Sequence, residues 1–120
     1  TLAGNVVDLE RVMGAADIFL TTSLWEGLPL VLLEAMACGL APLGFAIDGV
    51  NEILTDGVQG RVVPVGDIEA MAAALDDLLQ RPGQVAAYGA AARGLVLEAY
   101  DFETLLDLLT AVYEAGATRG

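Results

Sequence analysis

The residues that decide the fold run from Ser23 to Gly39 and read SLWEGLPLVLLEAMACG. A loop opens this stretch, and Pro29 suits the first turn of a helix because its missing N–H is no loss there. Leu, Ala and Met, which are strong helix formers, fill the rest, and Gly39 is a typical helix terminator. The stretch therefore predicts a loop followed by an apolar helix over 28–38.

Two carboxylates bracket the start of this helix. Glu26 lies just before it, and Glu34 is the only charged residue between Gly27 and Ile47. A helix N-terminus presents unpaired N–H groups and a partial positive charge, so it can hold a phosphate, and Gly27 allows a close backbone approach. Both glutamates could accept hydrogen bonds from hydroxyls. An anion flanked by two polyol-binding carboxylates describes a nucleotide diphosphate sugar.

In this context, Glu26 and Glu34 with seven residues between them resemble the E-x7-E motif of family 4 retaining glycosyltransferases, the group 1 glycosyl transferases with the GT-B fold. The likeness continues in residues 16–20 before the motif and in 49–53 and 56–60 after it. It covers nearly the whole chain, residues 1–114.

The resemblance implies a role for each residue of the motif. In that family the first glutamate contacts the donor sugar, the second contacts the ribose, and the intervening amides contact the diphosphate. Glu26 is thereby implied to be catalytic. Family members need no bound metal or other cofactor, and the donor is a substrate. The donor-binding residues that the resemblance implies are Glu26, Gly27, Leu28, Pro29, Leu30 and Glu34.

The same residues have structural interpretations. Glu26 could simply favour the helix dipole, and Glu34 could point to solvent. Ser23 could donate to a phosphate or form the turn, and Trp25 could line the base or sugar pocket or anchor packing. Arg61 could reach a phosphate, but near a strand start it more often pairs with an acid.

Two segments depart from the family pattern. Glu52 follows a loop in which Asp48 replaces the first glycine of the family's G-G-x-x-E pattern, so Glu52 is a weaker site candidate. Residues 41–45, APLGF, replace the usual proline and β-branched run. Because Pro42 removes a ladder donor and Gly44 weakens a strand, we expect an irregular strand, or drift in a protein no longer selected for catalysis.

Composition excludes several classes of function. The chain has 120 residues and a net charge of −12, from 17 acids and 5 basic residues that are all arginine, which argues against nucleic acid and anionic membranes as partners. It contains no histidine, so a histidine-dependent metal site is excluded, and the single Cys38 excludes an internal disulfide. No basic leader is visible at Thr1, and we expect a cytoplasmic protein.

The chain order predicts an α/β fold: a partial Rossmann-like domain with a short parallel sheet and about five helices. We expect a donor-binding unit over 1–115 and a flexible tail over 116–120. Residues 27–47 are apolar, but Glu34 and Pro29 argue against a membrane span. The expected helix over 68–79 has its apolar residues at Ile68, Met71, Ala72, Leu75, Leu78 and Leu79. The expected elements are helices at 8–15, 28–38, 68–79, 83–100 and 101–114 and a short helical turn at 51–54, with strands at 17–20, 42–45 and 61–63.

The leading hypothesis is the later half of the donor domain of a retaining hexosyltransferase, inactive by itself. Its N-terminal acceptor domain would lie upstream, and peripheral membrane contact is expected only through that domain. The alternative is a degenerate or excised half-domain that acts as a self-associating interaction module. Such a module would form a homodimer through the sheet edge that the missing strands would cover.

Overall fold

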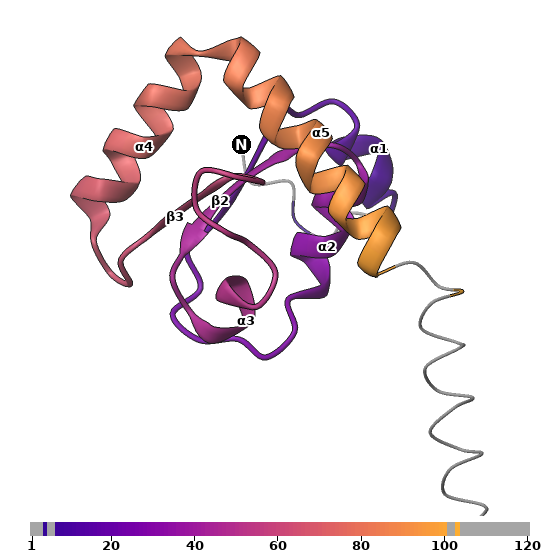
Figure 1. The fold of residues 1–120 in the computed structure, drawn as a ribbon, viewed down its shortest axis with the longest axis horizontal. Helices are drawn as coiled ribbons and strands as arrows, with labels where there is room; N and C mark the ends of the chain where they lie inside the picture. Colours follow the sequence, from indigo (N-terminus) through magenta and orange to yellow (C-terminus); the bar gives the residue numbers. More distant parts are fainter. Residues whose placement is uncertain (1–3, 5–6, 101–102, 104–120) are drawn as a thin grey trace, which may run out of the picture.

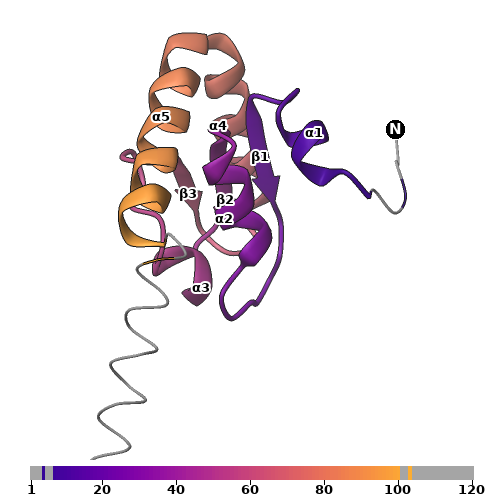
Figure 2. The same ribbon diagram turned by 90° about the vertical axis from the view of Figure 1, so that its right-hand side faces the viewer.

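The computed structural model of the protein describes residues 4, 7–100 and 103. Within them, three strands form one parallel sheet in the order β1-β2-β3, accompanied by five helices (Figures 1 and 2). The predicted α/β fold is therefore confirmed. In chain order the elements are α1 (Leu9–Met13), β1 (Ile18–Thr21), α2 (Leu30–Ala37), β2 (Ala41–Phe45), α3 (Asp48–Asn51), β3 (Arg61–Val63), α4 (Ile68–Gln80) and α5 (Pro82–Ala99).

β2 is the central and most deeply buried strand. It pairs in parallel with β1 on one side and with β3 on the other, and all five of its residues are buried. Leu43 and Phe45 join one apolar core with Leu32 and Met36 of α2 and Leu78 of α4. A parallel strand covered in this way is apolar throughout, as this one is.

The prediction of an irregular strand at 41–45 is wrong, and the position of Pro42 explains why. The N–H of Ala46 donates to the carbonyl of Val63 in β3. Backbone groups of alternate strand residues point to the same neighbouring strand, so Pro42 also directs its backbone toward β3. The pairing of β2 with β3 begins only at Leu43, so the missing N–H of proline removes no ladder bond.

α2 begins two residues later than predicted. Pro29 has φ −79° and ψ 89°, and this ψ is not helical, so the proline is the N-cap and Leu30 is the first helical residue. At the other end Gly39 has φ +82°, the left-handed conformation that favours glycine, and it terminates the helix as predicted. The residues that α2 buries are Leu32, Ala35 and Met36.

α4 and α5 form an arch over the sheet (Figure 1). Asp67 is the N-cap of α4, because its carboxylate accepts a hydrogen bond from the N–H of Ala70 at 2.9 Å. Pro82 lies in the first turn of α5. Gly89 lets α5 approach the turn before β2 closely, since a Cβ at this position would collide with the carbonyl oxygen of Gly39.

The apolar spacing over 68–79 predicted the existence of α4 but only part of its buried face. Met71 and Leu78 are buried as expected. Ile68 and Leu79 are 62% and 66% exposed, because they lie at the two ends of the helix, whose buried residues are Met71, Ala74 and Leu78.

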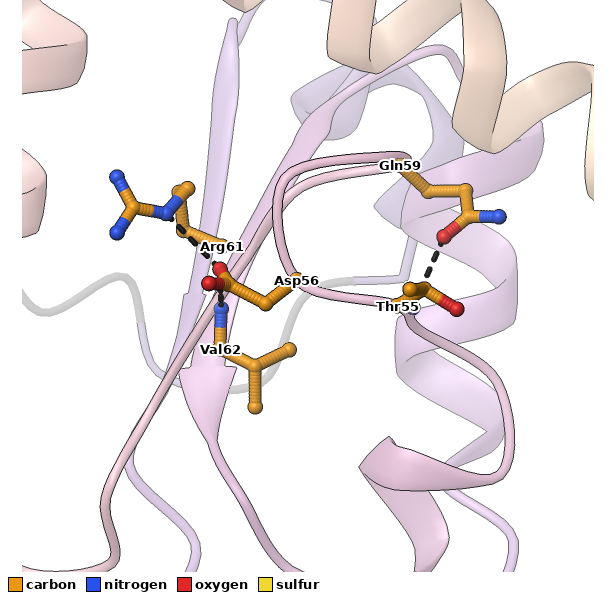
Figure 3. Close-up of polar contacts among 5 residues, drawn as sticks. All are labelled: Thr55, Asp56, Gln59, Arg61 and Val62. Atoms are coloured by element: carbon orange, nitrogen blue, oxygen red, sulfur yellow. Dashed lines mark hydrogen bonds and ion pairs between the residues drawn. The ribbon is translucent and has the colours of Figure 1, made fainter.

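Asp56 closes the loop between α3 and β3 (Figure 3). Its Oδ1 accepts from Nε of Arg61 and from the N–H of Val62, both at 2.9 Å, and Oε1 of Gln59 accepts from the N–H of Thr55 at 2.9 Å. Arg61 therefore pairs with an acid, the interpretation that the sequence favoured. Burial alone would raise the pKa of Asp56, but the hydrogen bonds from Val62 and Arg61 outweigh it and lower this pKa below its ordinary value of 3.8.

Two further expectations concern segments of the chain. Residues 27–47 form loop, helix, turn and strand as expected, and no helix among the described residues is long and apolar enough to cross a membrane. The expected helix over 101–114 and the flexible tail over 116–120 lie outside the described residues, except for Glu103.

The close approach at Gly89 predicts a stability difference between two glycines of α5. Gly89→Ala should destabilise the protein by about 1–3 kcal/mol, because backbone atoms must move to admit the methyl group. Gly94→Ala is the matched control: no atom lies within 4 Å of the added methyl group, so the change should stabilise the helix by about 0.5–1 kcal/mol. Urea unfolding of the variants measures both, and equal effects would contradict the packing described.

The Asp56 hydrogen bonds predict a pH-dependent contribution to stability. Because the folded-state pKa of Asp56 is lowered, the contribution is present above 3.8 and is lost as pH falls through the folded-state value. Side-chain exposures of 51% for Asp56 and 31% for Arg61 limit it to less than about 1 kcal/mol at pH 7. Urea unfolding should give a free energy of unfolding that is higher for wild type than for Asp56→Asn at pH 7, and this difference should shrink at pH 3. A difference that does not change with pH would contradict the assignment.

Candidate functional site

The loop between β1 and α2, residues 22–29, lies at the carboxyl end of the sheet, where open parallel sheets bind ligands. α3 follows β2 at the same end and meets this loop (Figures 1 and 2). The contact is made by backbone: a Cβ on Gly49 would collide with the carbonyl oxygen of Gly27 and would lie 3.0 Å from that of Glu26. The Glu26–Gly27 segment therefore rests directly on α3.

The N-terminus of α2 carries backbone donors without acceptors. The N–H groups of Leu32 and Leu33 donate to the carbonyl of Pro29 at 3.0 and 3.3 Å. In the part of the chain that the structure describes, the N–H groups of Leu30 and Val31 donate to nothing, and no side chain caps the helix. Unpaired N–H groups and the positive end of a helix dipole are the kind of environment that attracts an anion. Pro29 has no N–H to offer, so it shapes the helix start rather than donating.

The side chains around this N-terminus do not pack over it. Leu28 and Leu30 are 55% and 63% exposed, and Trp25 is 86% exposed. The interpretation of Trp25 as a packing anchor is therefore wrong, whereas its place in a donor pocket stays a prediction. The hydroxyl of Ser23 is 3.4 Å from that of Thr21, which donates to it, so this serine makes the turn contact that the sequence allowed.

Glu34 lies one turn further along α2 and is exposed. It shares a helix face with Leu30, four residues before it, and with Ala37 and Cys38 after it. This face borders a hollow of about 600 Å³ that α1 and α5 also line. The carboxylate is thus open to water, as an otherwise apolar segment requires. The residues lining the hollow are Val7, Asp8, Leu9, Met13, Glu34, Ala37, Cys38 and Arg93.

The two glutamates lie at successive levels along α2. Glu26 is half-buried in the loop before the helix and does not line the hollow. With a rise of about 1.5 Å per residue, the Cα of Glu34 is about 6 Å further along the axis than that of Leu30. The two carboxylates therefore lie in neighbouring regions along one helix, and no single pocket contains both.

The acids that follow β2 belong to α3. The helical turn expected at 51–54 begins earlier, because Val50 and Asn51 donate to the carbonyl of Ile47, and Asp48 is exposed in the first turn. Glu52 is the C-cap of α3 and is also exposed. Neither acid lines the hollow beside Glu34, and a donor-site role for Glu52 stays a prediction.

Two charged residues of the hollow, Asp8 and Arg93, were not assigned to the site from the sequence. Oδ1 of Asp8 accepts a long hydrogen bond of 3.4 Å from the N–H of Arg11 in α1. Arg93 of α5 donates through Nη1 to the carbonyl of Ala37, 56 positions away in the chain. A contact over that separation leaves no local pattern, so only the folded structure shows it.

A smaller hollow of about 270 Å³ lies at the amino end of the sheet, beside Gly39 and Val85, and Asp17 is the only charged residue that lines it. Within residues 4, 7–100 and 103, no three His, Cys, Asp or Glu side chains lie close enough together to hold a metal ion.

Comparisons with known proteins identify the family and the fold of the chain. The family model described as glycosyl transferases group 1 matches residues 1–95. The phosphatidyl-myo-inositol mannosyltransferase of Mycolicibacterium smegmatis is 37% identical over 120 residues, and the match covers 98% of this chain but 31% of that protein. The chain thus spans about a third of the length of this curated relative.

Two solved structures are similar in fold. Sucrose-phosphate synthase from Thermosynechococcus elongatus matches with a TM-score of 0.87 and 26% identity, over 91% of this chain and 27% of that one. Anabaena HepE in complex with UDP matches with a TM-score of 0.90 and 22% identity, over 94% of this chain and 31% of that one. Both place the chain within the GT-B architecture.

The contact between α3 and the loop predicts different effects at its two glycines. Gly49→Ala should destabilise the protein by about 1–3 kcal/mol, because the methyl group collides with backbone. No atom lies within 4 Å of a Cβ on Gly27, so Gly27→Ala should change stability by less than about 0.5 kcal/mol. Thermal unfolding monitored by circular dichroism tests this difference, and a tolerated Gly49→Ala would mean that the loop does not rest on α3.

Proposed function

The chain belongs to the group 1 glycosyl transferases, and from this premise we propose that it forms the donor-binding part of a retaining hexosyltransferase. The donor is a nucleotide diphosphate sugar. The observation that carries the proposal is the open N-terminus of α2 with Glu26 beside it and Glu34 one turn further on. The family membership and the mannosyltransferase relative support the reaction class.

The diphosphate binds at the N-terminus of α2. The unpartnered N–H groups of Leu30 and Val31 donate to its oxygens, and Gly27 lets the phosphate approach the loop without a side chain in the way. Leu28 contributes its N–H from the loop, and Pro29 holds the helix start in place. These donors stabilise the negative charge that grows on the leaving diphosphate as the sugar departs, which is electrostatic catalysis.

The nucleoside lies along the helix, in the hollow beside Glu34. The carboxylate accepts hydrogen bonds from the ribose hydroxyls, and its level, about 6 Å along the axis from Leu30, matches the step from a phosphate to a ribose. A hollow of about 600 Å³ has room for the base. HepE, which is similar to this chain in fold, is solved in complex with UDP, and this supports a nucleotide as the ligand.

Glu26 serves the sugar end of the donor. Glu26 precedes the N-terminus of α2 in the chain, whereas Glu34 follows it. A sugar attached to a diphosphate at that N-terminus would lie on the Glu26 side. The carboxylate of Glu26 accepts hydrogen bonds from sugar hydroxyls and orients the anomeric carbon, which makes Glu26 the catalytic residue of this chain. Ser23, Trp25 and Glu52 are secondary candidates for contacts with the donor.

Three of the four described arginines are held away from the N-terminus of α2, and the fourth, Arg11, is exposed on α1. Among the described residues, Arg61 is bound to Asp56 and Arg81 to Asp77, away from α2. Arg93 lies at the opposite end of α2 from the anion site. The net charge of −12 further opposes an anionic donor. The basic residues for the diphosphate therefore come from outside this chain, as does the acceptor domain, and the chain alone is inactive.

The whole protein acts in the cytoplasm, and any membrane contact is peripheral and made through its acceptor domain. The chain itself binds neither nucleic acid nor an anionic membrane, because its acidic balance repels phosphate-rich surfaces. Besides the acceptor, the proposal requires only the donor sugar nucleotide and no further cofactor.

A second candidate function rests on β1. In the described residues, this strand pairs only with β2, so its outer edge is open, and Leu20 on it is 42% exposed. Open edges of this kind pair with other chains. A self-associating, non-catalytic module would sediment as a dimer without nucleotide affinity, whereas a compact monomer that binds nucleotide supports the donor-binding function.

The proposed site predicts weak, localised nucleotide binding. In NMR titrations of the ¹⁵N-labelled chain, UDP or GDP should shift the amides of Leu30 and Val31 with a dissociation constant of about 1 mM, since helix donors act without a cation. Glu34→Gln should weaken binding about tenfold by replacing a charged acceptor with a neutral one. Glu69→Gln, which removes an exposed acid from α4, is the matched control and should bind as wild type does.

Three results would contradict parts of this proposal. If the amide signals at the N-terminus of α2 do not shift, the donor does not bind there. Equal binding by wild type and Glu34→Gln would remove the ribose contact. Micromolar binding by the bare chain would overturn the conclusion that essential cations lie elsewhere.

A further inference from the structure

The C-terminus of α2 is completely satisfied by hydrogen bonds. The last four carbonyls of a helix lack partners within it. In α2, the carbonyls of Glu34 and Met36 accept from the N–H groups of Cys38 and Gly39, and that of Ala35 accepts from Leu40. The remaining carbonyl, on Ala37, is the one that accepts from the guanidinium of Arg93. Three of the four bonds are local, and α5 supplies the fourth.

α5 holds this end of α2 at two points. Gly89 brings the backbone of α5 against the carbonyl of Gly39, just beyond the helix. Arg93 follows one turn later on the same face of α5, at i+4, and reaches the carbonyl of Ala37. A cation at a helix C-terminus also interacts favourably with the negative end of the dipole. α5 thus holds the last turn of α2 in position and places a positive charge at the negative end of its dipole.

Glu34 belongs to that last turn. It precedes Ala37 by three residues, on the same helix face, and Glu34, Ala37 and Arg93 all line the same hollow. Arg93 makes no ion pair with Glu34 in the described residues, so the carboxylate stays available to a ligand. The guanidinium therefore influences the position and orientation of Glu34 indirectly, through the backbone of the helix.

We propose that Arg93 is a positioning residue for nucleoside binding: by holding the carbonyl of Ala37, it fixes the turn of α2 that carries Glu34. The inference rests on the proposed function, because it requires the ribose at Glu34. It assigns Arg93 to the nucleoside end of the donor and not to the diphosphate end, which lies at the other end of α2. A helix cap without this role would affect stability alone.

The experiment compares diphosphate ligands that carry a nucleoside with one that does not. NMR titrations with UDP, GDP and inorganic pyrophosphate are made on wild type, Arg93→Gln, Arg93→Lys and Arg81→Gln. The initial slope of amide shift against ligand concentration gives relative affinities without saturation. Arg81→Gln makes the same chemical change at the other end of α5, where Arg81 pairs with Asp77 on the surface.

Arg93→Gln should weaken the binding of UDP and GDP about tenfold, which is the effect of losing one charged hydrogen bond. The affinity for pyrophosphate should change less than about twofold. Arg93→Lys should recover part of the loss because it retains the charge and a donor. Arg81→Gln should match wild type for all three ligands. If Arg93→Gln lowers the folded fraction, Arg93→Met takes its place, since it keeps the aliphatic stem.

Two outcomes would overturn the positioning role. One is an unchanged nucleotide affinity in folded Arg93→Gln or Arg93→Met. The other is an equal loss for nucleotide and pyrophosphate, which would indicate a general disturbance of α2. If wild type itself fails to bind UDP and GDP, the proposed function fails, and this result is distinct from both.

Discussion

The two ends of α2 differ in how far their backbone hydrogen-bonding groups are satisfied, and the proposed site depends on this difference. The C-terminal carbonyls of α2 are all satisfied by the chain, whereas the N–H groups of Leu30 and Val31 at its start have no acceptor within the described residues. A helix of eight residues cannot be stable on its own, so packing must hold it in place. The sheet and α5 provide that packing, α3 supports the loop before the helix, and the start of the helix stays exposed.

Glycines make the contacts that set the position of α2. Gly49 lets α3 support the loop before the helix, and Gly89 lets α5 approach the turn after it. At both sites a side chain would collide with backbone, so no rotamer change could relieve the strain. The loop that contains Glu26 and the turn that contains Glu34 are therefore supported by separate elements, and the fold as a whole sets the spacing between their backbones.

Local signals in the sequence predicted the elements well. Pro29, Gly39, Asp67 and Pro82 each act at one end of a helix through their own backbone or side chain, so their effects can be read without the fold. The motif likewise identified Glu26 and Glu34 as site candidates. Errors arose where the tertiary environment decides the outcome. The tolerance of Pro42 depends on where β3 begins, and the exposure of Trp25 depends on which elements lie nearby. The contact of Arg93 joins segments too distant for any local pattern to reveal.

The most direct test of the donor arrangement is a crystal structure of the chain with UDP or GDP at millimolar concentration. The arrangement predicts phosphate oxygens within hydrogen-bonding distance of the N–H groups of Leu30 and Val31, with the ribose hydroxyls on the Glu34 carboxylate and the base in the hollow beside it. A nucleotide bound instead at the amino end of the sheet, beside Asp17 and Gly39, would contradict it.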